Sequence, residues 1–251
     1  MTHDLDWGFI LFVTILAVLV TAVFTSPLVF LWRTHLAGFY GSDAFFQAWS
    51  TWWFHKAVRE LGQSPARMNM IHYPIEFFNP ILVAGPWTRL MPVPLLRLLT
   101  PTQVYNLQLF ASYVLTCVLM SILCLELTGA RGAAVLGGAV FTFCANRTLH
   151  AVDGHLTLAL GYTYPLLVLA FWRAVKQPGA WRGLALGGAL IAASTVDLTP
   201  SAYFVAPMIL SLLAHFLLTE REQILSRGTL RTLTLGFGVA ALVVLPFLWP
   251  L

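Results

Sequence analysis

Apolar runs of membrane-spanning length follow one another along most of the chain. The first, Trp7 to Trp32, has about 26 residues, more than the roughly 20 that a helix needs to cross the hydrocarbon core of a bilayer. We therefore predict an all-α, polytopic integral membrane protein in which about seven transmembrane helices form a single module over residues 1–251. The six further runs are Val104 to Leu125, Gly132 to Cys144, Leu156 to Trp172, Gly183 to Val196, Ala202 to Leu218 and Leu233 to Leu251.

The composition supports this class of protein. Hydrophobic residues make up 59% of the chain and charged residues 10%, and the mean hydropathy is +0.79, which excludes an ordinary soluble domain. The net charge of +4 does not indicate nucleic-acid binding, because the basic residues are scattered between apolar segments and are not clustered with stacking aromatic residues. The three cysteines lie within apolar runs, where a free thiol behaves as a small hydrophobe.

Two of the predicted spans are short. Gly132 to Cys144 and Gly183 to Val196 each reach only about 20 Å at the 1.5 Å rise of a helical residue. They cross a bilayer only if flanking residues extend them or the bilayer is locally thin, and otherwise they enter it partway. These alternatives stay open at the level of the sequence.

Basic residues predict how the helices are oriented. The leader before Trp7 has no lysine or arginine, so it lacks the basic region of a cleaved signal peptide. The intervening short loops carry only Arg147, and the basic side of a membrane protein faces the cytoplasm. We therefore expect a cytoplasmic N-terminus, an external C-terminus and an external loop over residues 33–103. The basic residues of the alternate loops are Arg131, then Arg173, Lys176 and Arg182, then Arg221, Arg227 and Arg231.

The aspartates beyond the leader fall on the predicted outer face. Asp43 opens a helix predicted from Ala44 to Leu61, Asp153 precedes Gly154 as in a turn, and Asp197 precedes a proline-containing helix start. Helix capping, turn formation and loop solvation explain such residues without any chemistry. Capping and catalysis are compatible roles for Asp43.

Two histidines accompany Asp153 in what the sequence suggests is one short outer loop. His150 and His155 could hold a divalent cation together with this carboxylate, although their spacing matches no strong zinc pattern. Histidines in loops are more often simply solvated. The sequence leaves a metal cofactor undetermined.

The long outer loop has an aromatic and a proline-rich part. The predicted helix from Ala44 to Leu61 is dense in phenylalanine and tryptophan, as in a helix that lies in the membrane interface. Prolines between Pro86 and Pro101 interrupt further helix and favour a compact, partly re-entrant segment. Its cations, Arg67, Arg89 and Arg97, are suited to lipid phosphates.

The order of several short motifs resembles the bacterial polytopic glycosyltransferases of the GT-C superfamily, over nearly the whole chain. An aspartate opens an outer tryptophan-rich helix after the first span, and a helix of small residues follows later. The remaining elements are Tyr73-Pro74, Pro92-Val93-Pro94, Tyr105-Asn106-Leu107, Gly154-His155-Leu156 and Tyr164-Pro165-Leu166.

The resemblance implies transfer of a sugar from a polyprenyl-phosphate donor to an acceptor on the periplasmic or external face of the bacterial inner membrane. It implies that Asp43 is the catalytic base and that Asp153 matches the second acidic position. Asp153 and His155 would orient the base or hold a divalent ion, and arginines would stabilise the departing phosphate. The implied substrate-binding residues are His155, His150, Arg67, Arg89, Arg147 and Tyr73.

Two departures from that family pattern favour a second interpretation. Asp43 has no adjacent acidic partner, and the chain ends within an apolar run, as the N-terminal module of a longer protein would. The alternative is an inactive accessory or scaffold subunit that packs glycine-rich surfaces, around Gly137-Gly138 or Gly187-Gly188, against other membrane subunits. A transporter is disfavoured, because no predicted span carries an ionisable residue near its middle. Membrane lipids are expected partners in every case.

Overall fold

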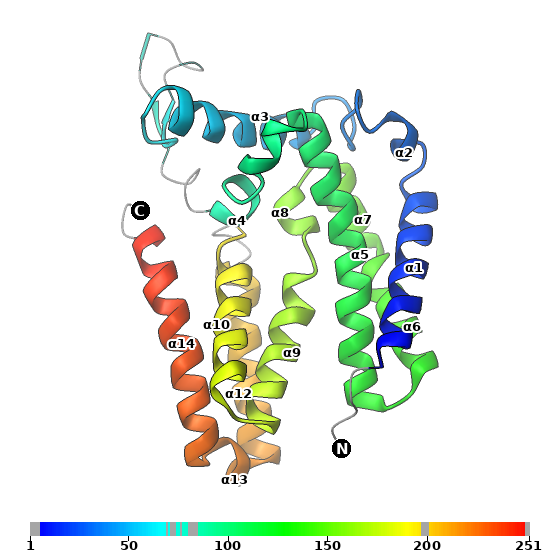
Figure 1. Cartoon of the computed structure of the whole chain (residues 1–251), viewed down its shortest axis with the longest axis vertical. Helices are drawn as coiled ribbons and strands as arrows, with labels where there is room; N and C mark the ends of the chain where they lie inside the picture. The colour runs from blue at the N-terminus through cyan, green and yellow to red at the C-terminus, as the bar shows by residue number, and fades with distance from the viewer. Residues whose placement is uncertain are drawn as a thin grey trace. The chain divides into compact units, whose positions relative to one another are not determined.

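The computed structural model is a helical protein, with 76% of the described residues in helices and 2% in strands. It describes residues 6–68, 70, 74–75, 77–79, 85–196 and 201–248. The chain forms two compact units (Figure 1). The first combines Met1–Trp49 with Pro94–Leu166, and the second combines Ser50–Val93 with Leu167–Leu251.

The first unit is built around α5, its longest helix. Thr100 and Gln103 form a capping box at the start of α5, Pro101 occupies the first turn, and Gly129 ends the helix in a left-handed conformation with φ of 68°. Its elements are α1 (Trp7–Phe24), α2 (Leu28–Leu31), the start of α3 (Ala44–His55), α5 (Pro101–Thr128), α6 (Arg131–Thr142), α7 (Ala145–Val152), α8 (Leu156–Ala159) and the start of α9 (Thr163–Lys176). The 3-10 helix η3 (Val93–Arg97) precedes α5.

Helix α1 ends earlier than the apolar pattern predicts. Its side-chain cap is Asp6, which accepts a hydrogen bond from the Phe9 N–H, and it stops at Phe24 before Pro27. Proline has no N–H to donate and cannot continue a helix. The predicted span from Trp7 to Trp32 is therefore two helices, α1 and α2.

Close packing joins α1, α5 and α6 (Figure 1). A Cβ atom on Gly138 of α6 would lie 2.0 Å from the Ser121 Oγ and 2.8 Å from the Cys117 carbonyl oxygen of α5. The small residues at Gly137 and Gly138 thus allow α6 to approach α5. This surface is used within the chain.

The second unit pairs α10 with α14. A Cβ on Gly183 would lie 2.8 Å from the Thr232 carbonyl oxygen, and one on Gly187 would lie 3.1 Å from that of Gly236. The unit also holds a two-stranded antiparallel sheet, which the all-α prediction missed. Its elements are the end of α3, the π-helical turn η1 (Lys56–Glu60), β1 (Arg67–Met68), β2 (Phe77–Phe78), α4 (Pro86–Arg89), the rest of α9, α10 (Ala180–Ser194), η4 (Ser201–Val205), α12 (Ala206–Thr219), α13 (Arg221–Ile224) and α14 (Arg227–Leu248).

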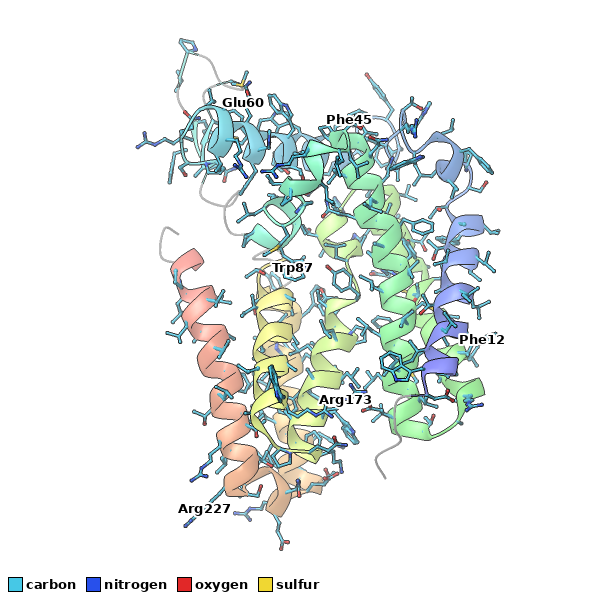
Figure 2. The ribbon with its side chains drawn as sticks, in the orientation of Figure 1. Phe12, Phe45, Glu60, Trp87, Arg173 and Arg227 are labelled. Carbon is cyan, nitrogen blue, oxygen red and sulfur yellow. The ribbon has the colours of Figure 1, made fainter. Side chains whose placement is uncertain are left out.

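Three helices in the described part of the chain are long and apolar enough to cross a membrane. They are Trp7–Phe24, Pro101–Thr128 and Arg227–Pro246, and Tyr203–Thr219 is a shorter apolar helix. Exposed apolar side chains such as Phe12 on α1 fit a lipid environment (Figure 2). The coarse class of the prediction, a helical membrane protein, is compatible with these helices.

Two other predicted elements have different outcomes. The predicted helix from Ala44 to Leu61 is present as α3 continued by η1. The predicted run from Leu156 to Trp172 is not continuous, because α8 ends at Ala159 and α9 begins at Thr163. Gly161 lies in this break, beside the buried side chain of Arg147.

Candidate functional site

Asp43 lies at the start of α3, where its backbone carbonyl accepts the Gln47 N–H at 2.9 Å. Its side chain is 61% exposed, and one carboxylate oxygen, Oδ2, lies 3.3 Å from Nε2 of His155. Two residues further along, the Phe45 side chain of α3 is 51% exposed (Figure 2). The structure thus gives the predicted base a direct imidazole partner.

His155 also contacts His150, so that three side chains form a line. The two Nδ1 atoms are 3.3 Å apart, and the ring centroids are separated by 5.5 Å. If His155 donates its Nε2–H to Asp43, its Nδ1 is free to accept the Nδ1–H of His150. This tautomer satisfies both contacts and leaves Oδ1 of Asp43 available to a substrate.

Main-chain contacts bring these residues together across more than a hundred positions of sequence. The Asp43 N–H donates to the Asp153 carbonyl oxygen at 3.2 Å, and the Phe39 N–H donates to that of Val152 at 3.2 Å. Gly154, with φ of +77°, makes this approach possible, because a Cβ there would lie 2.2 Å from the Ala44 nitrogen. We call the pairing of residues 38–44 with residues 152–154 the main-chain clamp.

Asp153 contributes to this clamp through its backbone. It is the C-cap of α7, and its N–H donates to the Leu149 carbonyl oxygen at 2.9 Å. The segment around His150, predicted to be a loop, is therefore mostly helical. The structure brings the main chains of Asp43 and Asp153 together, whereas a catalytic role for the Asp153 carboxylate stays a prediction.

The line of Asp43, His155 and His150 does not surround a common point. Among the residues that the structure describes, no group of three or more histidine, cysteine or acidic side chains is placed to hold a metal ion. The residues therefore do not fit the divalent cation considered from the sequence.

Arg147, predicted to bind phosphate, is buried in the first unit with 5% exposure. Its Nε donates to the Ala159 carbonyl oxygen at 2.8 Å, its Nη1 to the Thr142 carbonyl oxygen at 3.0 Å and its Nη2 to the Ser112 Oγ at 2.5 Å. Burial lowers the pKa of Arg147 to about 10, which still leaves it protonated at neutral pH. These contacts indicate a structural role, in which Arg147 joins α5, α7 and the end of α8.

Of the other predicted cations, Arg97 ends η3 in the first unit, and Arg67 and Arg89 belong to the second unit. Arg67 is exposed on β1, opposite Phe78, and Arg89 is buried at the end of α4. Near Arg89, the Thr88 hydroxyl donates to the Val196 carbonyl oxygen at 3.2 Å. Tyr73 and Asp197 lie outside the described residues.

Asn106 is a supporting residue that no chemical argument from the sequence singled out. Its Nδ2 donates to the carbonyl oxygens of Trp32 and His35 at 2.9 and 2.7 Å, and its Oδ1 accepts the Ala37 N–H at 3.0 Å. It therefore holds the segment that leads from α2 to Asp43. A buried amide within an apolar run is the sequence signal that could have identified it.

Comparison of the chain with protein-family models, with curated proteins and with solved structures returns no match.

Proposed function

We propose that this chain is a membrane glycosyltransferase that moves a sugar from a polyprenyl-phosphate donor to an acceptor on the outer face of the membrane, with Asp43 as the base. The observation that carries the proposal is the Asp43 carboxylate held 3.3 Å from His155 by the main-chain clamp. A carboxylate fixed at a helix start, with one oxygen free, is suited to accept a proton from a bound hydroxyl.

The proposed reaction uses one proton transfer and one substitution. Asp43 takes the proton of the acceptor hydroxyl, the acceptor oxygen bonds to the anomeric carbon, and the bond from that carbon to the phosphate oxygen breaks. The polyprenyl phosphate leaves with the bonding electron pair. His155 positions the carboxylate by donating to Oδ2, and His150 fixes the tautomer of His155.

The resemblance assigns cations of the outer loop to the departing phosphate, since guanidinium groups form charge-assisted hydrogen bonds with phosphate oxygens. Its two candidates there, Arg67 and Arg89, belong to the second unit, and Arg89 is buried, so neither is assigned to the Asp43 site. Arg147 is not assigned to the phosphate, because each of its three nitrogens already donates to a protein acceptor. It supports the site by fixing α7, which carries His150.

The proposed topology has seven spans in a bacterial inner membrane, with the N-terminus in the cytoplasm. The long apolar helices α1, α5 and α14 supply three of them. The shorter helices α6, α10 and α12, and the broken pair α8 and α9, would complete the set where the bilayer thins around them. The alternation of basic loops supports this orientation.

The test measures sugar transfer from a polyprenyl-phosphate sugar by the whole chain reconstituted in vesicles. Asp43→Asn keeps the shape of the side chain and removes the base, so transfer should fall by about 10²- to 10⁴-fold. Glu222→Gln, an equivalent change at an exposed carboxylate of α13, is the matched control and should leave the rate unchanged. Undiminished transfer by Asp43→Asn would refute the proposal.

An inactive accessory subunit is the second candidate, and the high exposure of Asp43 favours it, since a base is usually shielded from water. The glycine-rich surfaces that an accessory subunit would use to bind its partners count against this candidate. Gly138, Gly183 and Gly187 all pack against helices of the same chain. An accessory subunit would show no transfer with any donor and would co-purify with another membrane protein.

A further inference from the structure

A groove lies between α1 and α6 in the first unit, and its volume is about 730 Å³. The wall of the groove is apolar along most of its length, with Phe9 and Phe12 from α1 and Val135 and Leu136 from α6. Phe12 and Leu136 are exposed, so the groove is open on one side. Because α1 is long enough to cross a membrane, the medium on that side is the acyl chains of lipids.

One end of the groove is charged. Asp6 and Arg131 line it at the starts of α1 and α6, and Nη2 of Arg131 donates a hydrogen bond to Oδ2 of Asp6. The side chain of Arg131 is 72% exposed and that of Asp6 is 36% exposed, so a ligand can reach both. Trp7, beside Asp6, is also exposed, as is typical of tryptophan at the depth of lipid headgroups. The apolar wall therefore ends in an accessible pair of opposite charges where headgroups are expected.

The ion pair leaves binding capacity on both side chains. A guanidinium group has several N–H donors, and each carboxylate oxygen can accept more than one hydrogen bond. Oδ1 of Asp6 also accepts the Phe9 N–H at 3.1 Å, which fixes the carboxylate at the start of α1. Exposed ion pairs contribute little to stability, so a ligand that pairs with both groups can compete for them.

Two adjacent opposite charges distinguish between classes of lipid. Arg131 alone would suit the phosphate of any phospholipid, but Asp6 repels a headgroup that has only negative charge. A zwitterionic headgroup carries a phosphate and an amine two carbons apart, and so offers a partner to each side chain. A primary ammonium donates hydrogen bonds to a carboxylate, whereas the trimethylammonium group of phosphatidylcholine has no N–H to donate.

We infer that this groove binds phosphatidylethanolamine from the bilayer. Its phosphate oxygens accept hydrogen bonds from Arg131, its ammonium group donates to Asp6, and one acyl chain lies against Phe12 and Leu136. This site is separate from the proposed sugar-transfer site and does not depend on it.

The experiment places the whole chain in phosphatidylcholine nanodiscs that contain a trace of a lipid with a diazirine in its acyl chain. The trace lipid is phosphatidylethanolamine, phosphatidylcholine or phosphatidylglycerol, with identical chains. After illumination, mass spectrometry quantifies the labelling of the peptides that contain Phe12 and Leu136. Asp6→Asn removes the charge and keeps an oxygen that can cap α1. Glu220→Gln is the matched control, because it also neutralises an ion-paired carboxylate, the partner of Lys176, but one that does not line the groove.

Phosphatidylethanolamine should label the groove about fivefold more than either other lipid, the difference that one ordinary hydrogen bond makes. Asp6→Asn should remove that preference, and Glu220→Gln should keep it. Equal labelling by phosphatidylethanolamine and phosphatidylcholine in the unmodified protein would overturn the inference, as would a preference that survives Asp6→Asn. Stronger labelling by phosphatidylglycerol would also overturn it, by showing that Arg131 alone selects the headgroup.

Gly132→Leu tests the groove without changing its charges. Gly132 lines the groove, and nothing lies within 4 Å of the position that its Cβ would take, so α6 has room for a larger side chain there. That side chain should fill part of the groove and lower its labelling by phosphatidylethanolamine. Gly188→Leu, at a glycine of α10 that has the same open space, should leave the labelling unchanged. Undiminished labelling in Gly132→Leu would show that the lipid lies outside the groove.

Discussion

Replacing Gly154 with alanine should open the main-chain clamp that holds Asp43. Two costs follow from the geometry. At φ of +77° a non-glycine residue costs roughly 1–2 kcal/mol, and a Cβ only 2.2 Å from the Ala44 nitrogen forces a backbone shift that adds about 1–3 kcal/mol. We expect the variant to lose about 2–5 kcal/mol of unfolding free energy if the clamp stays closed.

The Gly154→Ala variant can instead open the main-chain clamp, at a free-energy cost similar to that of keeping it closed. It breaks the two hydrogen bonds that Phe39 and Asp43 donate to the segment before Gly154, at roughly 0.5–1.5 kcal/mol each. We therefore expect Gly154→Ala to populate an open form in which Asp43 and His155 separate. Sugar transfer should fall with it.

Gly129→Ala is the matched control for this variant. Gly129 has nearly the same φ, +68°, but nothing lies within 4 Å of the position that its Cβ would take. It should lose only the roughly 1–2 kcal/mol of backbone strain. The difference between the stability losses of the two variants therefore isolates the cost of the contact between the new Cβ and Ala44.

The assay combines denaturant unfolding in detergent with an electron-spin distance measurement. Nitroxide labels on cysteines introduced at Tyr40 and Leu149, both exposed, report on the two sides of the clamp after the native cysteines are replaced. The distance distribution should lengthen and broaden in Gly154→Ala and stay unchanged in Gly129→Ala. Equal stability losses and equal distances in the two variants would refute the argument.

Three further substitutions test the surroundings of the site. Arg147→Met leaves buried acceptors without their donor and should cost about 3 kcal/mol in unfolding free energy, measured by denaturation in detergent. Asn106→Leu leaves two carbonyl oxygens and one N–H unpaired and should cost about 2–4 kcal/mol in the same assay, with faster proteolysis of the segment after α2. The Phe9 N–H, and then Arg131, hold the pKa of Asp6 below its usual value of 3.8, so its contribution to stability is present above that pH and is lost as the pH falls through the lowered folded value. Thermal unfolding of Asp6→Asn should accordingly depend less on pH between pH 5 and about 3, and an unchanged acid dependence would contradict this assignment.

Local signals explain which parts of the fold could be predicted. The run from Val104 to Leu125 became α5, and its true ends are marked by a capping box at Thr100 and by Gly129. Pro27 was equally visible within the first apolar run, and giving it more weight would have placed the end of α1 correctly. The length of the apolar run alone overestimated the length of α1.

Contacts between distant segments explain what could not be predicted. The sequence suggested that Asp43 and Asp153 share a face, but the clamp depends on the tertiary approach of Gly154 to Ala44. The resemblance assigned Arg147 to phosphate, whereas Ser112 and Ala159, from other elements, surround it. A single sequence shows charge and local pattern, and it does not show which distant carbonyl oxygens will use a donor.

The central claim is that Asp43 and His155 act as one unit in sugar transfer. The most direct test is a double-mutant cycle on the transfer rate, with Asp43→Asn, His155→Gln and the double variant in the same vesicles. Because His155 acts only by positioning Asp43, the double variant should be no slower than Asp43→Asn alone. Independent, multiplicative losses would contradict the account, and so would full activity in Asp43→Asn.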